Sequence, residues 1–252
     1  LPQMSIITSG SAGFAIQTIL KKYNLPNLKC LVDHSLNENI VTILESLGCE
    51  IYKTDLSRKP FEWKEILTLT HNPDGLDITS NEALDPTTRF YDWMSYEIIN
   101  NDPEYCFIPF GTGNLYENIL NINKKEVSTE NHDPRFKGNI KILQRCNFIG
   151  ATVNNPKTKA DKLFSPHLPF VHFDEQWIRL YKYSGFCGEK STVYSLQERF
   201  LDQAIKIAEN NKIDCEPSGI AGLGMLLQMR DEIPRDAKIL IVNTGKTKLT
   251  NS

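Results

Sequence analysis

Two short segments of the chain combine glycine with hydroxyl-bearing residues in a way that suits the binding of an anion. Residues 8–13 read Thr-Ser-Gly-Ser-Ala-Gly, and residues 111–114 read Gly-Thr-Gly-Asn. Each segment follows a short apolar run and precedes a stretch with helical periodicity. The first turn of a helix has unpaired N–H donors and a partial positive charge, and glycine lets a ligand approach the backbone closely. The two segments therefore predict a phosphorylated or carboxylated small-molecule ligand.

Two nucleotide-binding motifs begin like the second segment, but the sequence departs from both. The dinucleotide fingerprint needs a third glycine where this chain has Tyr116, and an acidic residue that ends a strand about 20 residues later. Lys124 and Glu130 lie in a polar stretch in that region. Neither segment has the Lys and Ser or Thr that a Walker loop requires. The sequence thus disfavours dinucleotides and nucleoside triphosphates, and the alternative to a ligand site is a pair of tight turns.

The cysteines and histidines show no spacing typical of a metal site or a disulfide framework. The cysteines are widely spaced without a CxxC pair, and a chain of 252 residues does not need disulfides for stability. We therefore expect reduced core thiols, a cytoplasmic location and no metal site. The residues concerned are Cys30, Cys49, Cys106, Cys146, Cys187, Cys215, His34, His71, His132, His167 and His172.

The composition is that of an ordinary globular chain of one large or two smaller domains. Hydrophobic residues make up 40%, charged residues 23%, and the formal net charge is −3. A nucleic-acid-binding domain usually carries a basic patch, and a membrane-spanning helix needs about 20 apolar residues. We therefore expect neither a nucleic-acid partner nor a membrane partner.

Short apolar runs alternate with helical patterns, which predicts the α/β class with parallel strands joined by crossover helices. In the first third, the predicted strands are 4–7, 28–32 and 50–54, and the predicted helices are 13–23 and 36–47. Ser35 and Glu38 fit a capping box at the start of the second helix, and Gly48 fits the left-handed residue that ends it.

The stretch from residue 59 to 86 is interrupted by prolines and a glycine, so we expect an irregular crossing between domains there. Ser195 and Glu198 fit a second capping box, and 121–137 reads as a polar surface loop. In the remaining chain, the predicted helices are 88–100, 173–183, 196–210 and one from 217 onward, and the predicted strands are 105–110, 140–143, 148–153 and 238–242.

Four segments, in order, resemble the fold-type II pyridoxal-phosphate enzymes of the tryptophan synthase β family. They are residues 8–13, 111–114, 216–219 and 244–245. Threonine synthase is similar through Glu-Pro-Ser-Gly at 216–219 and Thr244, and cysteine synthase is similar through residues 8–10. The resemblance implies two α/β domains, each a mostly parallel sheet flanked by helices. We place the smaller domain at 1–85, incomplete at its N-terminus, and the larger, cofactor-binding domain at 86–252.

The resemblance also implies a cofactor, pyridoxal 5′-phosphate, and a division of the site residues. Thr8, Ser9, Gly10 and Ala12 face the carboxylate of a small amino-acid substrate. Ser11 stands where the family usually has an asparagine beside the ring hydroxyl, and Thr244 approaches the pyridine nitrogen. The cofactor phosphate is held by Gly111, Thr112, Gly113 and Asn114.

The activity implied is a lyase or synthase reaction of amino-acid metabolism, carried out by a homodimer. It is elimination or replacement at the β or γ carbon of a small hydroxy or activated-hydroxy amino acid, with threonine-synthase-like chemistry as the most specific expectation. The family's Schiff-base lysine precedes the strand that begins here at Met4, and no residue of the chain takes that position. Either a leading segment carries the lysine, or the chain is an inactive family member that serves as a binding or regulatory protein.

Overall fold

The computed structural model describes residues 1–56, 61–79, 91–155, 157–164 and 175–246. The chain forms two compact units, whose described residues lie within 1–79 for the first and 91–246 for the second. Each unit contains one four-stranded parallel sheet with helices against it, so the predicted α/β class is confirmed. The boundary that we predict between residues 85 and 86 lies outside the described residues.

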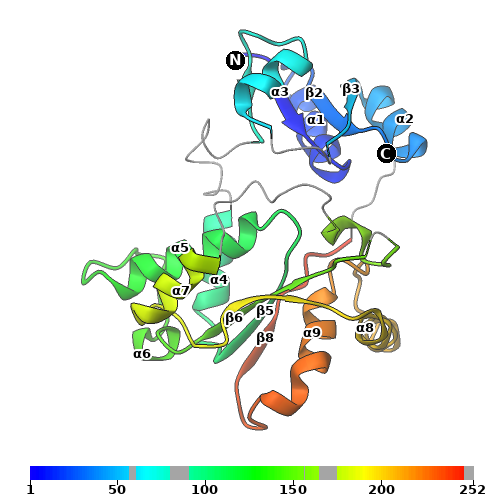
Figure 1. Ribbon diagram of the computed structural model, residues 1–252. Coiled ribbons are helices and arrows are strands. Elements are labelled where there is room, and N and C mark those ends of the chain that lie inside the picture. Colours follow the sequence, from blue (N-terminus) through cyan, green and yellow to red (C-terminus); the bar gives the residue numbers. More distant parts are fainter. Residues whose placement is uncertain (57–60, 80–90, 156, 165–174, 247–252) are drawn as a thin grey trace. The chain divides into compact units, whose positions relative to one another are not determined.

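The first unit alternates strands and helices along the chain (Figure 1). Its sheet has the order β3-β2-β1-β4, with every pair parallel. Its elements are β1 (Met4–Ile7), α1 (Ser11–Lys22), β2 (Lys29–Asp33), α2 (Glu38–Leu47), β3 (Glu50–Thr54), α3 (Trp63–Leu69) and β4 (Leu76–Asp77).

Alternation of side chains along β2 explains how this sheet is covered on both faces. Cys30 and Val32 belong to a core that includes residues of α1 and α2, such as Leu44. Leu31 points the other way and packs with Ile66 of α3. A parallel sheet buried on both faces requires a continuous apolar run, which is why the central strands show no polar alternation.

The second unit has the sheet order β7-β6-β5-β8, again with every pair parallel. Its helices are α4 (Asp92–Ile99), α5 (Asn114–Val127), α6 (Ile140–Leu143), α7 (Glu175–Tyr183), α8 (Glu198–Asn210) and α9 (Ala221–Met229), with 3-10 turns η2 (Asp161–Leu163) and η3 (Arg230–Glu232). Its strands are β5 (Tyr105–Pro109), β6 (Asn147–Thr152), β7 (Thr192–Ser195) and β8 (Ile239–Ile241).

Helices cover both faces of this second sheet. Figure 1 shows α9 on one side of β5 and β8 and α4, α5 and α7 on the other. Correspondingly, Cys106 and Ile108 of β5 pack in one core, whereas Phe107 packs in another with Met225 of α9. All residues of β5 are buried, as expected for the strand that lies between two others in the sheet.

Several sequence predictions of local structure are wrong, each for a local reason. Residues 140–143 form the helix α6 rather than a strand, because the Asn139 side chain accepts a hydrogen bond from the Lys141 N–H at 3.0 Å and caps the turn. The region predicted to be irregular contains α3, which a capping box of Glu62 and Glu65 starts, and the short strand β4. The predicted surface loop from residue 121 is helical as far as Val127.

Both capping boxes predicted from serine are also wrong. α2 begins after Asn37, whose side chain accepts from the Asn39 N–H at 2.9 Å. Ser195 ends the strand β7, which the sequence analysis missed, and α8 begins two residues after Leu196. The prediction for Gly48 is confirmed, since it ends α2 in the left-handed conformation with φ of 111°. In the described residues, no helix has the length and apolar character needed to cross a membrane.

Candidate functional site

The glycine segments follow the carboxyl ends of strands at equivalent places in the two sheets. In the second unit, β5 lies between β6 and β8, so the chain continues from β5 to β6 on one side and returns after β7 to add β8 on the other side. Such switch points are where open α/β sheets bind ligands. Residues 111–114, which we call the phosphate loop, follow β5, and residues 243–245, which we call the ring-nitrogen turn, follow β8. The predicted cofactor residues other than Ser11 therefore follow two adjacent strands, whereas Ser11 belongs to the first unit.

The phosphate loop has the backbone geometry of an anion cradle. Gly113 takes a left-handed conformation, with φ of 86° and ψ of −9°, immediately before α5 begins at Asn114. Among the described residues, none offers an acceptor to the backbone N–H groups of residues 111–115. The buried Oδ1 of Asn114 also has no hydrogen-bond partner in the described part of the chain. Polar groups left open at a helix N-terminus are what a phosphate group requires.

The phosphate loop and the first turn of α5 are closely packed against neighbouring elements. A Cβ on Gly111 would lie 3.0 Å from the backbone oxygen of Lys162 in η2. Tyr116, at the place of the third glycine of a dinucleotide fingerprint, is buried and donates from its hydroxyl to the Phe148 carbonyl at 2.9 Å. Its ring packs edge-on against Phe110. The large Tyr116 side chain occupies the contact between helix and sheet that a dinucleotide fold reserves for glycine, which fits a single phosphate better than a pyrophosphate.

The ring-nitrogen turn is held against the segment that begins α9. The Thr244 N–H donates to the Gly219 carbonyl at 3.3 Å, and the Glu216 N–H donates to the Gly245 carbonyl at 3.0 Å. The Asn243 side chain accepts from the Gly245 N–H at 2.9 Å. A Cβ at position 219 would lie 2.5 Å from the Gly245 carbonyl oxygen, so glycine there permits this close approach. Thr244 itself is exposed, which leaves its side chain open to a ligand.

Lys162 connects the phosphate loop to the segment that holds the ring-nitrogen turn, and the sequence analysis did not identify this residue. Its backbone N–H donates to the Ser218 hydroxyl at 3.2 Å, and its Nζ pairs with Glu216 Oε2 at 2.5 Å. The structure therefore brings together the phosphate loop, η2, residues 216–219 and the ring-nitrogen turn within one unit. No spacing rule would have predicted this pair, because its members lie 54 residues apart.

The segment predicted to hold the substrate carboxylate, residues 8–12, belongs to the first unit and runs from the end of β1 into the first turn of α1. Thr8 is buried, and its Oγ1 accepts from the N–H groups of Gly10 at 3.0 Å and Gly13 at 3.2 Å. Gly10 has φ of +126°, a conformation that side chains rarely adopt, and Ser11 is the first residue of α1. Thr8 thus organises the loop, while Ser9 and Ala12 are exposed.

Two buried thiols of the second unit are not activated as nucleophiles. Burial raises the pKa of Cys106 in β5 and of Cys146 before β6 well above the ordinary value for a thiol. In the first unit, the pKa of Cys49 is lowered by a hydrogen bond from Cys30, whose own pKa is raised by that bond and by burial. All six cysteines are free thiols, and five of them are buried. Nucleophilic cysteine chemistry at residues 111–114 is therefore not supported.

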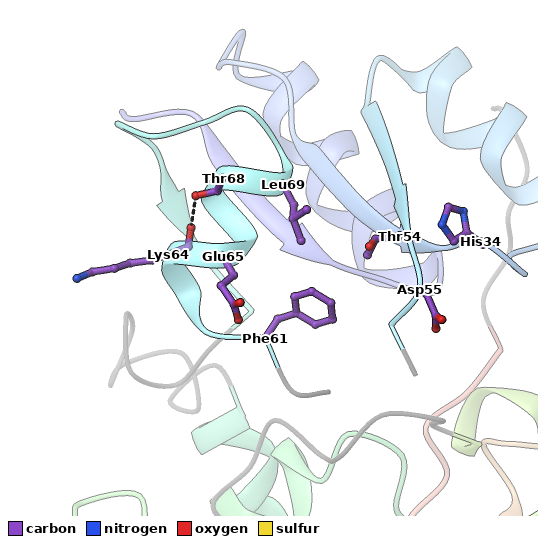
Figure 2. Close-up of a pocket in the computed structure, with 8 residues that line it drawn as sticks. All are labelled: His34, Thr54, Asp55, Phe61, Lys64, Glu65, Thr68 and Leu69. Atoms are coloured by element: carbon purple, nitrogen blue, oxygen red, sulfur yellow. Dashed lines mark hydrogen bonds between the residues drawn. The ribbon is translucent and has the colours of Figure 1, made fainter. Parts of the chain in front are cut away.

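A cavity of about 650 Å³ lies in the first unit, apart from the predicted site residues (Figure 2). His34 and Thr54 line it from the carboxyl ends of β2 and β3, and the Phe61 ring lies between Thr54 and α3, as Figure 2 shows. Its ionisable residues include acidic and basic groups, and Lys64 extends away from the other residues drawn. The mixture of charges favours no particular class of ligand.

Neither a protein-family model nor a curated protein matches the sequence. Solved structures do match. A hydrogen sulfide-producing enzyme has a TM-score of 0.69 at 15% identity, over 98% of this chain and 71% of that one. A pyridoxal 5′-phosphate-dependent aspartate racemase has 0.66 at 14%, over 99% and 75%. An O-acetylserine-dependent cystathionine beta-synthase from Helicobacter pylori has 0.64 at 14%, over 98% and 76%. These matches confirm the fold that the resemblance to fold-type II enzymes implies.

Proposed function

We propose that the chain binds pyridoxal 5′-phosphate and acts on a small hydroxy or activated-hydroxy amino acid by elimination or replacement. The observation that carries the proposal is the phosphate loop. Its N–H groups at the start of α5 have no acceptor among the described residues, Gly113 is left-handed, and Lys162 connects the loop to the ring-nitrogen turn. The fold shared with a pyridoxal 5′-phosphate-dependent racemase and with an O-acetylserine-dependent synthase supports this choice.

The residues of the chain divide the work of binding. Gly111, Thr112, Gly113 and Asn114 bind the phosphate, while Thr244 offers its hydroxyl to the pyridine nitrogen. When bound, the cofactor supplies an electron sink for breaking bonds next to the amino-bearing carbon. A neutral hydroxyl does not hold a proton on the ring nitrogen as a carboxylate does. Thr244 therefore favours elimination and replacement over reactions that need a fully stabilised carbanion.

In the first unit, the proposed role of residues 8–12 is to bind the carboxylate of the amino-acid substrate. Thr8 shapes this loop, and the exposed Ser9 provides a hydroxyl. Ser11 stands where the resembling enzymes have asparagine. The serine side chain is shorter than that of asparagine and has a hydroxyl instead of an amide. Within this proposal, threonine-synthase-like chemistry remains the most specific expectation, and a homodimer in the cytoplasm remains a prediction.

The experiment that tests the proposal is a turnover assay with two substrates of the expected class. The protein is incubated with pyridoxal 5′-phosphate and either O-phospho-L-homoserine or O-acetyl-L-serine, and release of phosphate or acetate is measured. We expect cofactor-dependent release from one of them. Saturable cofactor binding without release from either would contradict the enzyme proposal. It would favour the alternative, a binding or regulatory protein, which the serine at position 11 already supports.

A further inference from the structure

The pair Lys162–Glu216 lies where the phosphate loop and the ring-nitrogen turn meet the same segment. The backbone of Lys162 packs against the phosphate loop, since its carbonyl oxygen is 3.0 Å from the place where a Cβ on Gly111 would be. Glu216 is linked to the ring-nitrogen turn, because its N–H donates to the Gly245 carbonyl at 3.0 Å. The side chains of Lys162 and Glu216 then connect the two, with 2.5 Å between Nζ and Oε2.

A second interaction attaches Lys162 to the same segment. The Lys162 N–H donates to the Ser218 hydroxyl at 3.2 Å, so both the backbone and the side chain of this lysine bind residues 216–218. Two attachments from one residue restrict rotation of η2 relative to that segment more than a single flexible ion pair does. The spacing between the two cofactor segments therefore depends on Lys162.

The charges of the pair also suit an anionic ligand. Glu216 is a carboxylate whose side chain is 20% exposed, and its neighbour Lys162 packs on the loop that we propose to bind phosphate. The Lys162 ammonium group offsets the negative charge of this carboxylate.

We infer that Lys162 and Glu216 form a positioning pair, in which Lys162 fixes the spacing of the phosphate loop and the ring-nitrogen turn. This inference rests on the proposed function, because it assigns residues to the site for pyridoxal 5′-phosphate. It adds Lys162, which lies in none of the four motif segments, and it gives a role to Glu216, which the motif at 216–219 includes without a site role.

The chain offers a matched control for the substitution of Lys162. Lys159 lies three residues earlier, and its Nζ pairs with Asp202 Oδ1 at 2.6 Å. That pair connects the same segment to α8 instead of to the cofactor segments, and both its side chains are more exposed than those of Lys162 and Glu216. Lys159→Met therefore removes an ion pair of similar length without touching the proposed site.

The experiment measures the dissociation constant for pyridoxal 5′-phosphate by equilibrium dialysis, together with the melting temperature of the protein without added cofactor. We expect Lys162→Met to raise the dissociation constant about tenfold, the equivalent of about 1.4 kcal/mol, and Lys159→Met to change it less than about twofold. Lys162→Arg keeps the charge and should restore most of the affinity.

A merely structural role would give a different pattern. Because the pair is partly exposed, its loss should shift the melting temperature by less than about 3 °C, whereas the affinity falls clearly. Two results would overturn this inference and leave the proposed function standing. In the first, the dissociation constant of Lys162→Met lies within twofold of the wild-type value. In the second, Lys162→Met and Lys159→Met lose the same affinity. Absence of saturable binding by the wild-type protein would overturn both.

Discussion

The left-handed conformation of Gly113 provides a sharp test of the phosphate loop. An alanine with φ near 86° costs about 1–2 kcal/mol, because its Cβ approaches the following carbonyl oxygen. The loop can escape this strain by rotating φ to a negative value, which turns the N–H groups around residue 113 away from the ligand. One lost hydrogen bond to a charged phosphate is worth about 1.5–3 kcal/mol. Gly113→Ala should therefore weaken binding of pyridoxal 5′-phosphate by about 10- to 100-fold.

Gly185 is the matched control for this substitution. It has φ of +70° in the same unit, and a Cβ there would meet nothing within 4 Å. Gly185→Ala should carry the same conformational penalty as Gly113→Ala, and each should lower the melting temperature by about 2–8 °C. Only Gly113→Ala should change the affinity for the cofactor.

The assay is equilibrium dialysis of the wild-type protein and both variants against pyridoxal 5′-phosphate and against pyridoxal, which lacks the phosphate. We expect the loss in Gly113→Ala to be confined to the phosphorylated compound. Gly113→Ala that melts like Gly185→Ala but binds pyridoxal 5′-phosphate as tightly as the wild type would refute the assignment of residues 111–114 to the phosphate.

Three further predictions concern the ring-nitrogen turn, an ion pair and the thiols. Gly219→Ala should weaken binding of both pyridoxal 5′-phosphate and pyridoxal in dialysis, because the alanine Cβ would lie 2.5 Å from the Gly245 carbonyl oxygen and displace the ring-nitrogen turn. Unchanged affinity for both compounds would contradict the proposed role of this turn. The Arg135 guanidinium donates a hydrogen bond to the Asp133 carboxylate at 2.8 Å and holds the pKa of that carboxyl well below its usual range. The pair therefore stabilises the fold above about pH 4, and this contribution is lost as the pH falls through the folded-state pKa. Asp133→Asn should thus lower the melting temperature by about 2–4 °C at pH 7, with a smaller difference from wild type as the pH falls below about 4, and a constant difference would contradict this. In the native protein, iodoacetamide followed by mass spectrometry should find Cys215 modified first, since the other five cysteines are buried, and faster modification of any of those five would be inconsistent with the structure.

The features that the sequence predicted well are those fixed by backbone geometry close to the motif. Gly48 must allow a left-handed residue after a helix, so its conformation could be predicted from residue type and position. The strands 4–7 and 50–54 agree in their bounds with β1 and β3, because a clear helical pattern follows the first and another precedes the second.

The features that the sequence did not predict depend on residues far apart in the chain or on very short elements. Lys162 and Glu216 meet only after the sheet of the second unit has formed. Three of the four residues 140–143 are apolar, and a segment of four residues cannot distinguish a strand from one helical turn. The strand β7 is equally short and only partly buried, so its periodicity is too weak to detect.

The measurement that most directly tests the central claim is the affinity of the wild-type protein for pyridoxal 5′-phosphate compared with that for pyridoxal, with inorganic phosphate as competitor. The account predicts saturable binding of pyridoxal 5′-phosphate, at least about tenfold tighter than that of pyridoxal, and displacement by inorganic phosphate. Equal affinity for the two compounds, or no saturable binding of either, would contradict the claim that residues 111–114 bind the phosphate of this cofactor.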